Sequence, residues 1–328
     1  MNLASTGRLV CCSIVLGLVL LRSAPEALGA EAPADTAWAP EFFSTLILAE
    51  NDVAQHPHLA ARPGLRHVAE QAARGAWAPA LSAFHDYYMD KLARLPDVLG
   101  MPADLADPAI EFNGPFPAMV TTNAAARQKT IDAANALLGN PPGNAAQGPG
   151  FANALAQAFI YTKDERYLRQ WDLLMNAWAR QVDPLEQVRP VYMTPGDAKG
   201  APGAFQHLRL LRALAQVPAE ERTALRPETL ARMLAKLVRV YPLTTSLYHE
   251  SNPRNWINES SYMISWVGAA CDEFRSGALL ADKGRGMFER YGTTHVLPDG
   301  TEIQRLFGYN HMYLADGTRH VRLLDALY

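Results

Sequence analysis

The chain has 328 residues and carries 30 lysines and arginines against 33 aspartates and glutamates, a net charge of −3. Proteins that bind nucleic acid are usually basic, so this charge balance argues against nucleic acid as the partner. An acidic polymer would have to be bound by a local basic pocket rather than by the field of the whole protein.

Residues 1–30 resemble a secretory signal peptide. Arg8 provides a positive start, an apolar run follows over residues 9–21, and small residues over 27–30 offer a cleavage site. The apolar run is shorter than the roughly 20 residues that cross a bilayer. We expect the mature protein to span residues 31–328, to be periplasmic or secreted, and to have no membrane contact after cleavage.

Cysteine usage indicates that the mature chain depends on its core for stability. Cys11 and Cys12 lie in the apolar run and would leave with it, so only Cys271 remains. A single cysteine forms no intramolecular disulfide. A mature chain of roughly 300 residues is long enough to bury a sizeable hydrophobic core without one.

The first half of the mature chain reads as helices separated by one long loop region. Amphipathic helices are predicted over residues 38–52 and 67–74. The next predicted helix has an apolar stripe at helical spacing, made of Trp77, Leu81, Phe84, Tyr88, Leu92 and Leu95. Residues 96–150 are rich in Pro, Gly, Asn and Ala, with a helix expected only over 124–138.

Helical patterns continue through the second half. A helix over 151–161 precedes Thr162 and Glu165, whose spacing predicts a capping box that starts the next helix. That helix has a stripe of Tyr167, Trp171, Leu174 and Trp178. After a Pro/Gly-rich loop over 182–203, further helices are predicted over 205–217, 228–241, 255–274 and 277–291.

This order of elements predicts an all-α protein. The sequence has no run of alternating strands and no glycine-rich phosphate loop. Short loops between helices predict stacked antiparallel helical hairpins. The pattern leaves open whether the hairpins close into a ring or form an open solenoid, although the lack of a fixed repeat argues against the regular solenoid families.

The predicted helix over 255–274 has one polar face. Asn255, Glu259, Tyr262 and Trp266 share that face, and a mostly apolar stripe lies beside it. Aromatic rings and planar hydrogen-bonding groups together suit sugars, so this face is a candidate binding surface. The alternative is a core helix with polar residues in its first turn.

Four segments together resemble the N-terminal domain of the heparinase II/III-like polysaccharide lyases, a family that includes alginate lyases. They are ARGAWAPALSAFHDYY (73–88), FANALAQAFIYTKDERYLRQWDLLMNAW (151–178), NWINE (255–259) and LPDGTEIQRLFGYNHMYL (297–314). The resemblance implies an incomplete (α/α) toroid, which in the family is followed by a β-sandwich domain. It also implies cleavage of a glycosidic bond next to a uronic acid by β-elimination, with no cofactor.

The resemblance assigns roles to individual residues. Tyr309 matches the family's tyrosine and is the expected general acid, and the same phenol is a candidate for the base that removes the C5 proton. Asn255 matches an asparagine that contacts the substrate carboxylate, although it also suits a helix cap. Glu259 and Gln304 match family positions near the substrate, and Arg254 is a candidate cation for the uronate.

Several positions depart from the family pattern. Trp256 stands where some members have a histidine, and we expect it to contact substrate together with Tyr262. The family's Tyr-His pair is interrupted by Asn310, so either that residue or His311 takes the histidine's place. His249 and His295 lie near the motif ends and are further candidates.

The largest departure is that no strand-rich half follows the last motif. The family's C-terminal β-sandwich, which supplies another catalytic histidine, is absent from this chain. Either residues 31–328 are a truncated lyase domain, expected to be inactive and to expose an apolar interface, or the helical domain acts alone.

Two other functions stay open. A glycoside hydrolase on a helical toroid needs two carboxylates about 5 to 10 Å apart, and Glu259 with Asp183 or Asp299 would supply them. The other is a non-catalytic glycan-binding protein. No metal-ligand spacing such as H-E-x-x-H is present, so we expect no metal. The sequence leaves open which uronic-acid polysaccharide is bound and which oligomer forms.

Overall fold

The computed structural model describes residues 36–49, 59, 62–95, 120–140, 149–181, 200–238 and 264–294. The chain divides into two compact units, Met1–Ala34 and Asp35–Tyr328, and every described residue belongs to the second. The signal segment predicted over residues 1–30 therefore lies outside the described residues.

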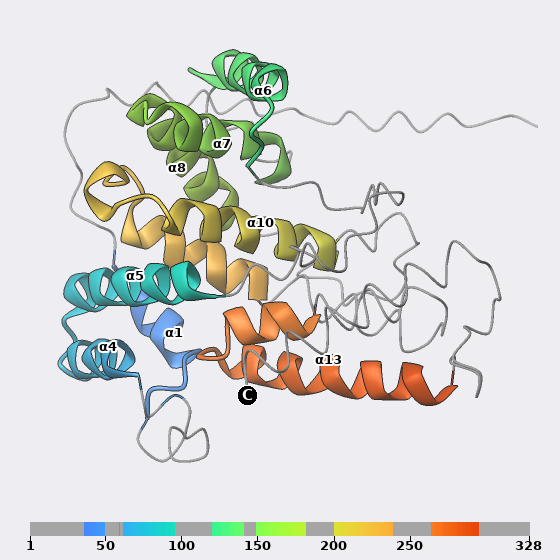
Figure 1. Ribbon diagram of the computed structural model, residues 1–328. Helices are drawn as coiled ribbons and strands as arrows, with labels where there is room; N and C mark the ends of the chain where they lie inside the picture. The colour runs from blue at the N-terminus through green and yellow to red at the C-terminus, as the bar shows by residue number, and fades with distance from the viewer. Residues whose placement is uncertain are drawn as a thin grey trace, which may run out of the picture. The chain divides into compact units, whose positions relative to one another are not determined.

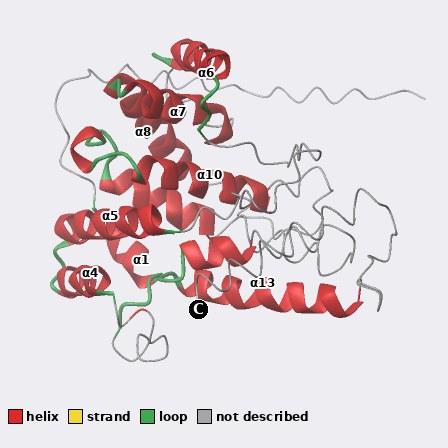
Figure 2. Cartoon of the chain, in the orientation of Figure 1, coloured by secondary structure: helices red, strands yellow, loops and turns green. Residues whose placement is uncertain are grey.

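The described residues are helical, as the sequence predicts. Figure 2 draws them as helices joined by loops, with no strand. The one β-type contact among them is an isolated antiparallel bridge between Leu46 and Phe274. The all-α class is therefore confirmed for this part of the chain.

The first helix, α1 (Ala39–Ser44), is shorter than the segment predicted over 38–52. The Thr45 hydroxyl donates a hydrogen bond to the Phe42 carbonyl at 2.6 Å, and the Ser44 hydroxyl donates to the Glu41 carbonyl at 2.6 Å. Such local bonds offer the helix carbonyls an alternative to further helical turns. The helix ends here, and the chain turns into the bridge at Leu46.

The helix α4 (Pro63–Ala73) begins four residues before the predicted start at 67, because proline is well tolerated in the first helical turn. It ends in a Schellman motif built on Gly75, which has a φ of +68°. The Gly75 amide donates to the Ala72 carbonyl at 3.0 Å, and the Ala76 amide donates to the Gln71 carbonyl at 3.1 Å. This tight turn leads directly into the next helix.

The helix α5 (Trp77–Arg94) confirms the predicted apolar stripe. It packs beside α4 as a hairpin (Figure 1). Its buried side chains include Leu81, Phe84, Tyr88 and Leu92. The predicted stripe is therefore the face that α5 turns toward the core.

The middle of the chain forms a second set of packed helices. The helix α6 (Ala124–Leu137) agrees with the predicted range, and a 3-10 turn, η2 (Pro149–Ala152), precedes α7 (Asn153–Thr162). The helices α7 and α8 (Glu165–Arg180) form a hairpin. Lys163 between them takes a left-handed φ of 60°, which reverses the chain direction.

The predicted cap of α8 is wrong. Asp164, not Thr162, is the N-cap, and its carboxylate accepts a hydrogen bond from the Arg166 amide at 3.0 Å. The Thr162 hydroxyl instead donates to the Ala158 carbonyl of α7 at 2.8 Å. A carboxylate at the cap also interacts well with the positive end of the helix dipole, so the closer Asp164 takes this role.

The helices predicted over 205–217 and 228–241 are present, with bounds that differ from the predicted ones by a few residues. The helix α10 (Gly200–Ala215) starts five residues before 205, and a 3-10 turn, η3 (Ala219–Glu221), follows. A helix is then described over residues 227–238, starting one residue before the predicted range of 228–241. Residues 239–263 lie outside the described residues.

The predicted helix over 255–274 ends earlier than expected. Residues 264–270 are helical, and a turn over 271–273 separates them from α13 (Arg275–Thr294). The turn forms because its backbone pairs with the segment that follows α1. The Ile47 amide donates to the Glu273 carbonyl at 2.7 Å, and the Arg275 amide donates to the Thr45 carbonyl at 3.0 Å. These long-range bonds override local helix propensity.

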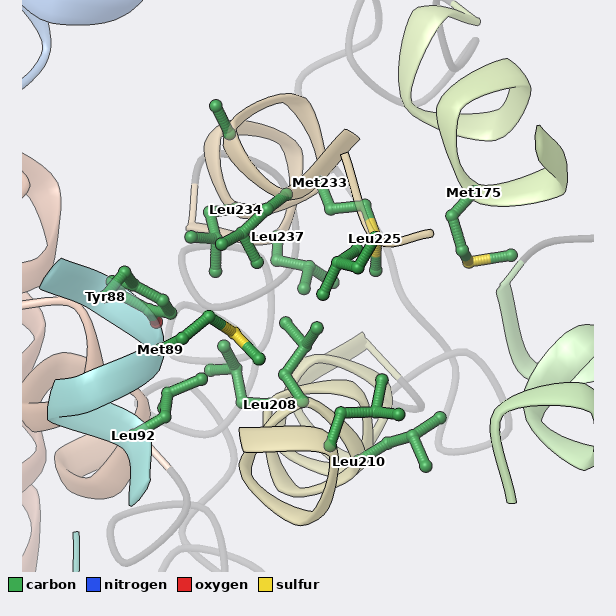
Figure 3. Packing of buried hydrophobic residues seen from close by; sticks show 14 of the residues in the cluster. Tyr88, Met89, Leu92, Met175, Leu208, Leu210, Leu225, Met233, Leu234 and Leu237 are labelled. Atoms are coloured by element: carbon green, nitrogen blue, oxygen red, sulfur yellow. The ribbon is translucent and has the colours of Figure 1, made fainter. Parts of the chain in front are cut away.

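One continuous hydrophobic core joins these helices. Figure 3 shows side chains of α5, α10 and residues 227–238 meeting within it. The labelled residues from these three helices are Tyr88, Met89, Leu92, Leu208, Leu210, Met233, Leu234 and Leu237. All are buried, so the helices are held by apolar packing and not by a disulfide; the free Cys271 is itself buried.

The close crossing of α13 with the turn at Cys271 predicts the effect of glycine substitutions. A Cβ on Gly277 would lie 2.6 Å from the carbonyl carbon of Cys271, and closer still to the carbonyl oxygen. We expect Gly277→Ala to lower the free energy of unfolding by about 1–3 kcal/mol, the usual cost of overpacking. Urea denaturation measures this change.

Gly286 of the same helix is the matched control. A Cβ there would meet nothing within 4 Å, and the residue is exposed. Gly286→Ala should raise the free energy of unfolding by about 0.5–1 kcal/mol, because alanine loses less backbone entropy in a helix. Equal effects of the two substitutions would contradict the close crossing.

Candidate functional site

The site residues predicted from the sequence lie outside the described residues. Residues 239–263 include Arg254, Asn255, Trp256, Glu259 and Tyr262, and residues 295–328 include Gln304, Tyr309, Asn310 and His311. The alternative carboxylates Asp183 and Asp299, and the candidates His249 and His295, also lie outside. Their roles stay predictions.

The described structure shows what adjoins these two segments. Residues 264–270 follow directly after the first segment, and α13 leads directly into the second. Trp266, which was expected to extend the sugar-binding face, is 1% exposed and belongs to the core. That extension of the face is therefore wrong, because the tight packing of 264–270 against its neighbours buries the indole.

A cluster of four buried or half-buried charges holds the turn between these helices; we call it the carboxylate clamp, made of Arg62, Lys91, Asp272 and Glu273. Arg62 donates from both terminal nitrogens to the two Asp272 carboxylate oxygens, at 2.7 and 2.8 Å. Lys91 donates to Asp272 at 2.7 Å and also to Glu273. Two cations and two carboxylates thus compensate one another.

The clamp joins parts of the chain that are far apart in sequence. Arg62 is the N-cap residue of α4, and Lys91 lies in the last turn of α5. Their partners follow residues 264–270, roughly 180 to 210 positions later. Tyr87 of α5 supports the arrangement by accepting a hydrogen bond from Arg62 at 3.0 Å. The clamp therefore anchors the start of α13 to the α4–α5 hairpin.

Burial changes the acid–base properties of the clamp. Loss of solvent, together with the negative charge of Asp272, raises the pKa of Glu273 to about 7, although Lys91 opposes the shift. Burial opposes protonation of Lys91, yet its two carboxylate partners raise its pKa overall. One Glu273 oxygen, Oε1, is buried without a hydrogen-bond partner. The Glu273 carboxyl therefore keeps its proton to a higher pH than an exposed glutamate does.

A tyrosine–cysteine contact lies beside the clamp. The Tyr88 hydroxyl and the Cys271 sulfur are 3.2 Å apart and both residues are fully buried. Burial, with the nearby charge of Glu273, raises the pKa of Cys271 to about 12. The thiol is therefore protonated at neutral pH and acts as a packing group rather than as a nucleophile.

A second set of buried charges joins α8 to residues 227–238. Arg226 directly precedes the helix over residues 227–238. Asp172 of α8 accepts a hydrogen bond from the Arg226 amide at 3.0 Å and another from the Arg226 side chain at 2.5 Å. Lys236 donates back to the Trp178 and Gln181 carbonyls at the end of α8, at 3.0 and 2.6 Å. Each charge thus lies at the helix end whose dipole it complements.

A buried histidine lies close to this helix pair. The ring of His207 in α10 is 6.5 Å from the Trp178 ring, and His207 is 5% exposed. Its Nδ1 atom is buried without a hydrogen-bond partner. Loss of solvent lowers the pKa of His207 to about 4, so the imidazole is neutral at pH 7.

These clusters explain stability and positioning better than catalysis. The carboxyl groups of Asp172 and Glu273 are almost fully buried, so substrate cannot reach them in this arrangement. Among the described residues, no group of His, Cys, Asp or Glu is arranged to hold a metal ion. None of the helices in the described part of the chain has the length and hydrophobicity needed to span a membrane.

Sequence reasoning missed the clamp, although one signal for it was present. Asp272 and Glu273 stand at the predicted end of a helix, where negative charge interacts badly with the helix dipole. Two acidic residues in such a place need cationic partners, and Lys91 and Arg62 are the ones that the fold provides. No local pattern identifies those partners in advance.

The sequence matches no family model and no curated protein. Three solved structures share its fold. Heparan sulfate lyase HepC from Pedobacter heparinus has a TM-score of 0.52 and 15% identity, covering 88% of this chain and 47% of that chain. A heparinase III with methylated lysines has a TM-score of 0.58 and 15% identity, covering 88% and 45%. Another structure of the same gene product has a TM-score of 0.55 and 14% identity, covering 88% and 44%.

Identity this low shows the fold alone. The likeness, with the helices described above, supports the expected incomplete (α/α) toroid of antiparallel hairpins. The chain spans less than half of the length of the solved structures it matches. Activity and substrate therefore belong with the proposals below.

The raised pKa of Glu273 predicts a pH dependence of stability. The folded state holds a proton that the unfolded state releases above about pH 4.5, so this contribution is complete below that value and is lost as pH rises through about 7. We expect the free energy of unfolding of Glu273→Gln to fall less than that of the wild type between pH 5 and 7.5. Urea denaturation at several pH values tests this, and parallel curves would contradict it.

The lowered pKa of His207 predicts the opposite trend. Its contribution is complete above about pH 6.5 and is lost as pH falls toward about 4, because the unfolded state then binds a proton that the folded state excludes. We expect His207→Gln to lose less stability than the wild type between pH 6.5 and 4.5. The same substitution at His67, whose side chain is 60% exposed, controls for loss of a histidine as such.

Proposed function

We propose that this chain is the helical part of a polysaccharide lyase that cleaves a uronic-acid-containing glycan by β-elimination. The observation that carries the proposal is the fold shared with a heparan sulfate lyase and a heparinase III over 88% of the chain. The motifs over 255–259 and 297–314, in their order along the chain, support the same reaction. Residues 1–30 support export to the periplasm or medium.

The proposed reaction needs three kinds of group. A base removes the proton from C5 of the uronate, the bond from C4 to the glycosidic oxygen breaks, and a C4–C5 double bond forms while the leaving oxygen takes a proton. Negative charge grows on the carboxylate side as the proton leaves. The site must therefore hydrogen-bond or neutralise that carboxylate in the transition state.

Residues of the two predicted segments are assigned to these tasks by their motif positions. Tyr309 serves as general acid, and as base if its phenolate is stabilised by neighbouring donors. Asn255 donates to the uronate carboxylate through its amide, with Arg254 as an additional cation. His311 assists the proton transfer, and Glu259 and Gln304 bind or orient the sugar.

An unsaturated product provides the test. The full chain is incubated with heparan sulfate, heparin and alginate, and ultraviolet absorbance of the new double bond is followed. We expect absorbance to rise with one polymer, and Tyr309→Phe to reduce kcat/KM at least a hundredfold, because the phenol supplies the transferred proton.

Tyr161→Phe is the matched control. That hydroxyl accepts one hydrogen bond from the Thr121 amide at 3.0 Å, away from the two motif segments in sequence, so activity should stay near the wild-type value. New reducing ends without absorbance would indicate a hydrolase. Binding without turnover would indicate a glycan-binding protein or a lyase domain that is inactive alone, so either result would reject lyase activity of this chain by itself.

A further inference from the structure

The Glu273 carboxyl group is completely enclosed, and its two oxygens differ in their surroundings. The residue is 0% exposed. Its Oε2 accepts a hydrogen bond from Lys91, and Nη1 of Arg62 lies 3.9 Å from the same oxygen. Its Oε1 is buried and has no hydrogen-bond partner. A carboxylate oxygen removed from water without a donor is costly, so this packing suits a neutral carboxyl group better than a charged one.

The neighbouring Asp272 provides an acceptor for a proton on Glu273. The two carboxyl groups lie within hydrogen-bonding reach of each other, and Lys91 donates to both of them, at 2.7 Å to Asp272. Two carboxylates form no hydrogen bond with each other, because neither has a hydrogen to donate. A proton on one of them supplies that hydrogen. The pair then carries one negative charge in place of two, which removes the repulsion between adjacent carboxylates.

The other titratable groups around Glu273 keep their protons across neutral pH. They come from α4, α5 and the turn itself, and are Arg62, Tyr87, Tyr88, Lys91 and Cys271. Burial raises the pKa of Tyr87 and that of Cys271 to about 12, and it also raises the pKa of Tyr88. Burial disfavours the charge of Lys91, yet its carboxylate partners raise its pKa overall. The Asp272–Glu273 pair is therefore the part of this cluster that changes charge near pH 7.

Glu273 also takes part in the backbone junction between distant segments. Its carbonyl accepts the hydrogen bond from the Ile47 amide at 2.7 Å, and the Arg275 amide donates to the Thr45 carbonyl at 3.0 Å. The residue between these contacts, Phe274, is 2% exposed and belongs to the core. Because the carboxyl group and the carbonyl belong to one residue of a tight turn, a movement of the carboxyl toward water displaces the backbone that holds the segment after α1.

We propose that Asp272 and Glu273 share one proton and together form a pH-sensitive latch. With the proton in place, the turn over residues 271–274 stays attached to α5 and to the segment Thr45–Ile47. When the pH rises and the proton passes to a buffer base, Oε1 of the charged Glu273 has no donor, and the junction loosens until water reaches it. The latch is independent of the lyase function proposed above.

Difference infrared spectra of the full chain between about pH 6 and pH 8.5 detect the shared proton directly. We expect the wild type to lose the carbonyl band of a protonated carboxyl group over this range. Glu273→Gln should lack this change, because the variant has no proton to release. Asp172→Asn is the matched control, since it removes a buried, ion-paired carboxyl group from α8 and should keep the change.

Hydrogen exchange followed by mass spectrometry measures the opening of the latch. Release of one proton changes the opening equilibrium by up to about tenfold per pH unit. After correction for the intrinsic effect of pH on exchange, we expect peptides over 45–47 and 271–276 to exchange about tenfold faster at pH 8.5 than at pH 6. Peptides of α8 over 165–180 should show no such rise, and Asp172→Asn should behave as the wild type.

Two substitutions should remove this pH dependence. The amide of Glu273→Gln keeps the neutral shape and donates to Asp272, so the rise in exchange should shrink to about twofold or less. The amide of Asp272→Asn donates to Glu273 from the other side, which gives Oε1 a donor at every pH and should have the same effect.

Three results would overturn the latch. They are a wild-type infrared change no larger than that of Glu273→Gln, equal pH-dependent exchange in these two proteins, and a rise in exchange spread evenly over the chain. The last would indicate a loss of global stability in place of a local opening. If Glu273→Gln does not fold, the wild-type spectra, the wild-type exchange pattern and Asp272→Asn decide.

Discussion

Two neighbouring carboxylates, the half-buried Asp272 and the fully buried Glu273, lie at a turn that pairs with residues 45–47. Their burial is tolerated because they are paired with Arg62 and Lys91, which belong to helices much earlier in the sequence. The backbone bonds of Thr45 and Ile47 close the same junction. Apolar packing supplies most of the driving force for folding, but this polar junction selects which helix ends meet.

The parts of the fold that were predicted correctly are those that depend on local pattern. The helix over Trp77–Arg94 and the α8 stripe follow from apolar residues at helical spacing, since burial of one face is decided within the helix itself. The glycine at +68° after α4 also follows a local rule, although it was not predicted. Such features need no knowledge of the partner helix.

The features that were missed depend on distant partners. The early end of residues 264–270 results from backbone bonds to Thr45 and Ile47, and the burial of Trp266 results from packing that no single helix specifies. The site residues Asn255 and Tyr309 were named from a resemblance and lie outside the described residues. Their assignment still depends on motif order alone, because the comparisons support the fold and not the roles.

The reciprocal contacts between α8 and residues 227–238, in which each helix places a charge at the end of the other, restrict how these helices can move. Asp172 and Lys236 do not face each other; each faces the end of the opposite helix. A slide of one helical turn, about 5.4 Å, would break the hydrogen bonds of both charges. The pair therefore has a single register, so α8 and residues 227–238 have to move together as one unit rather than slide past each other.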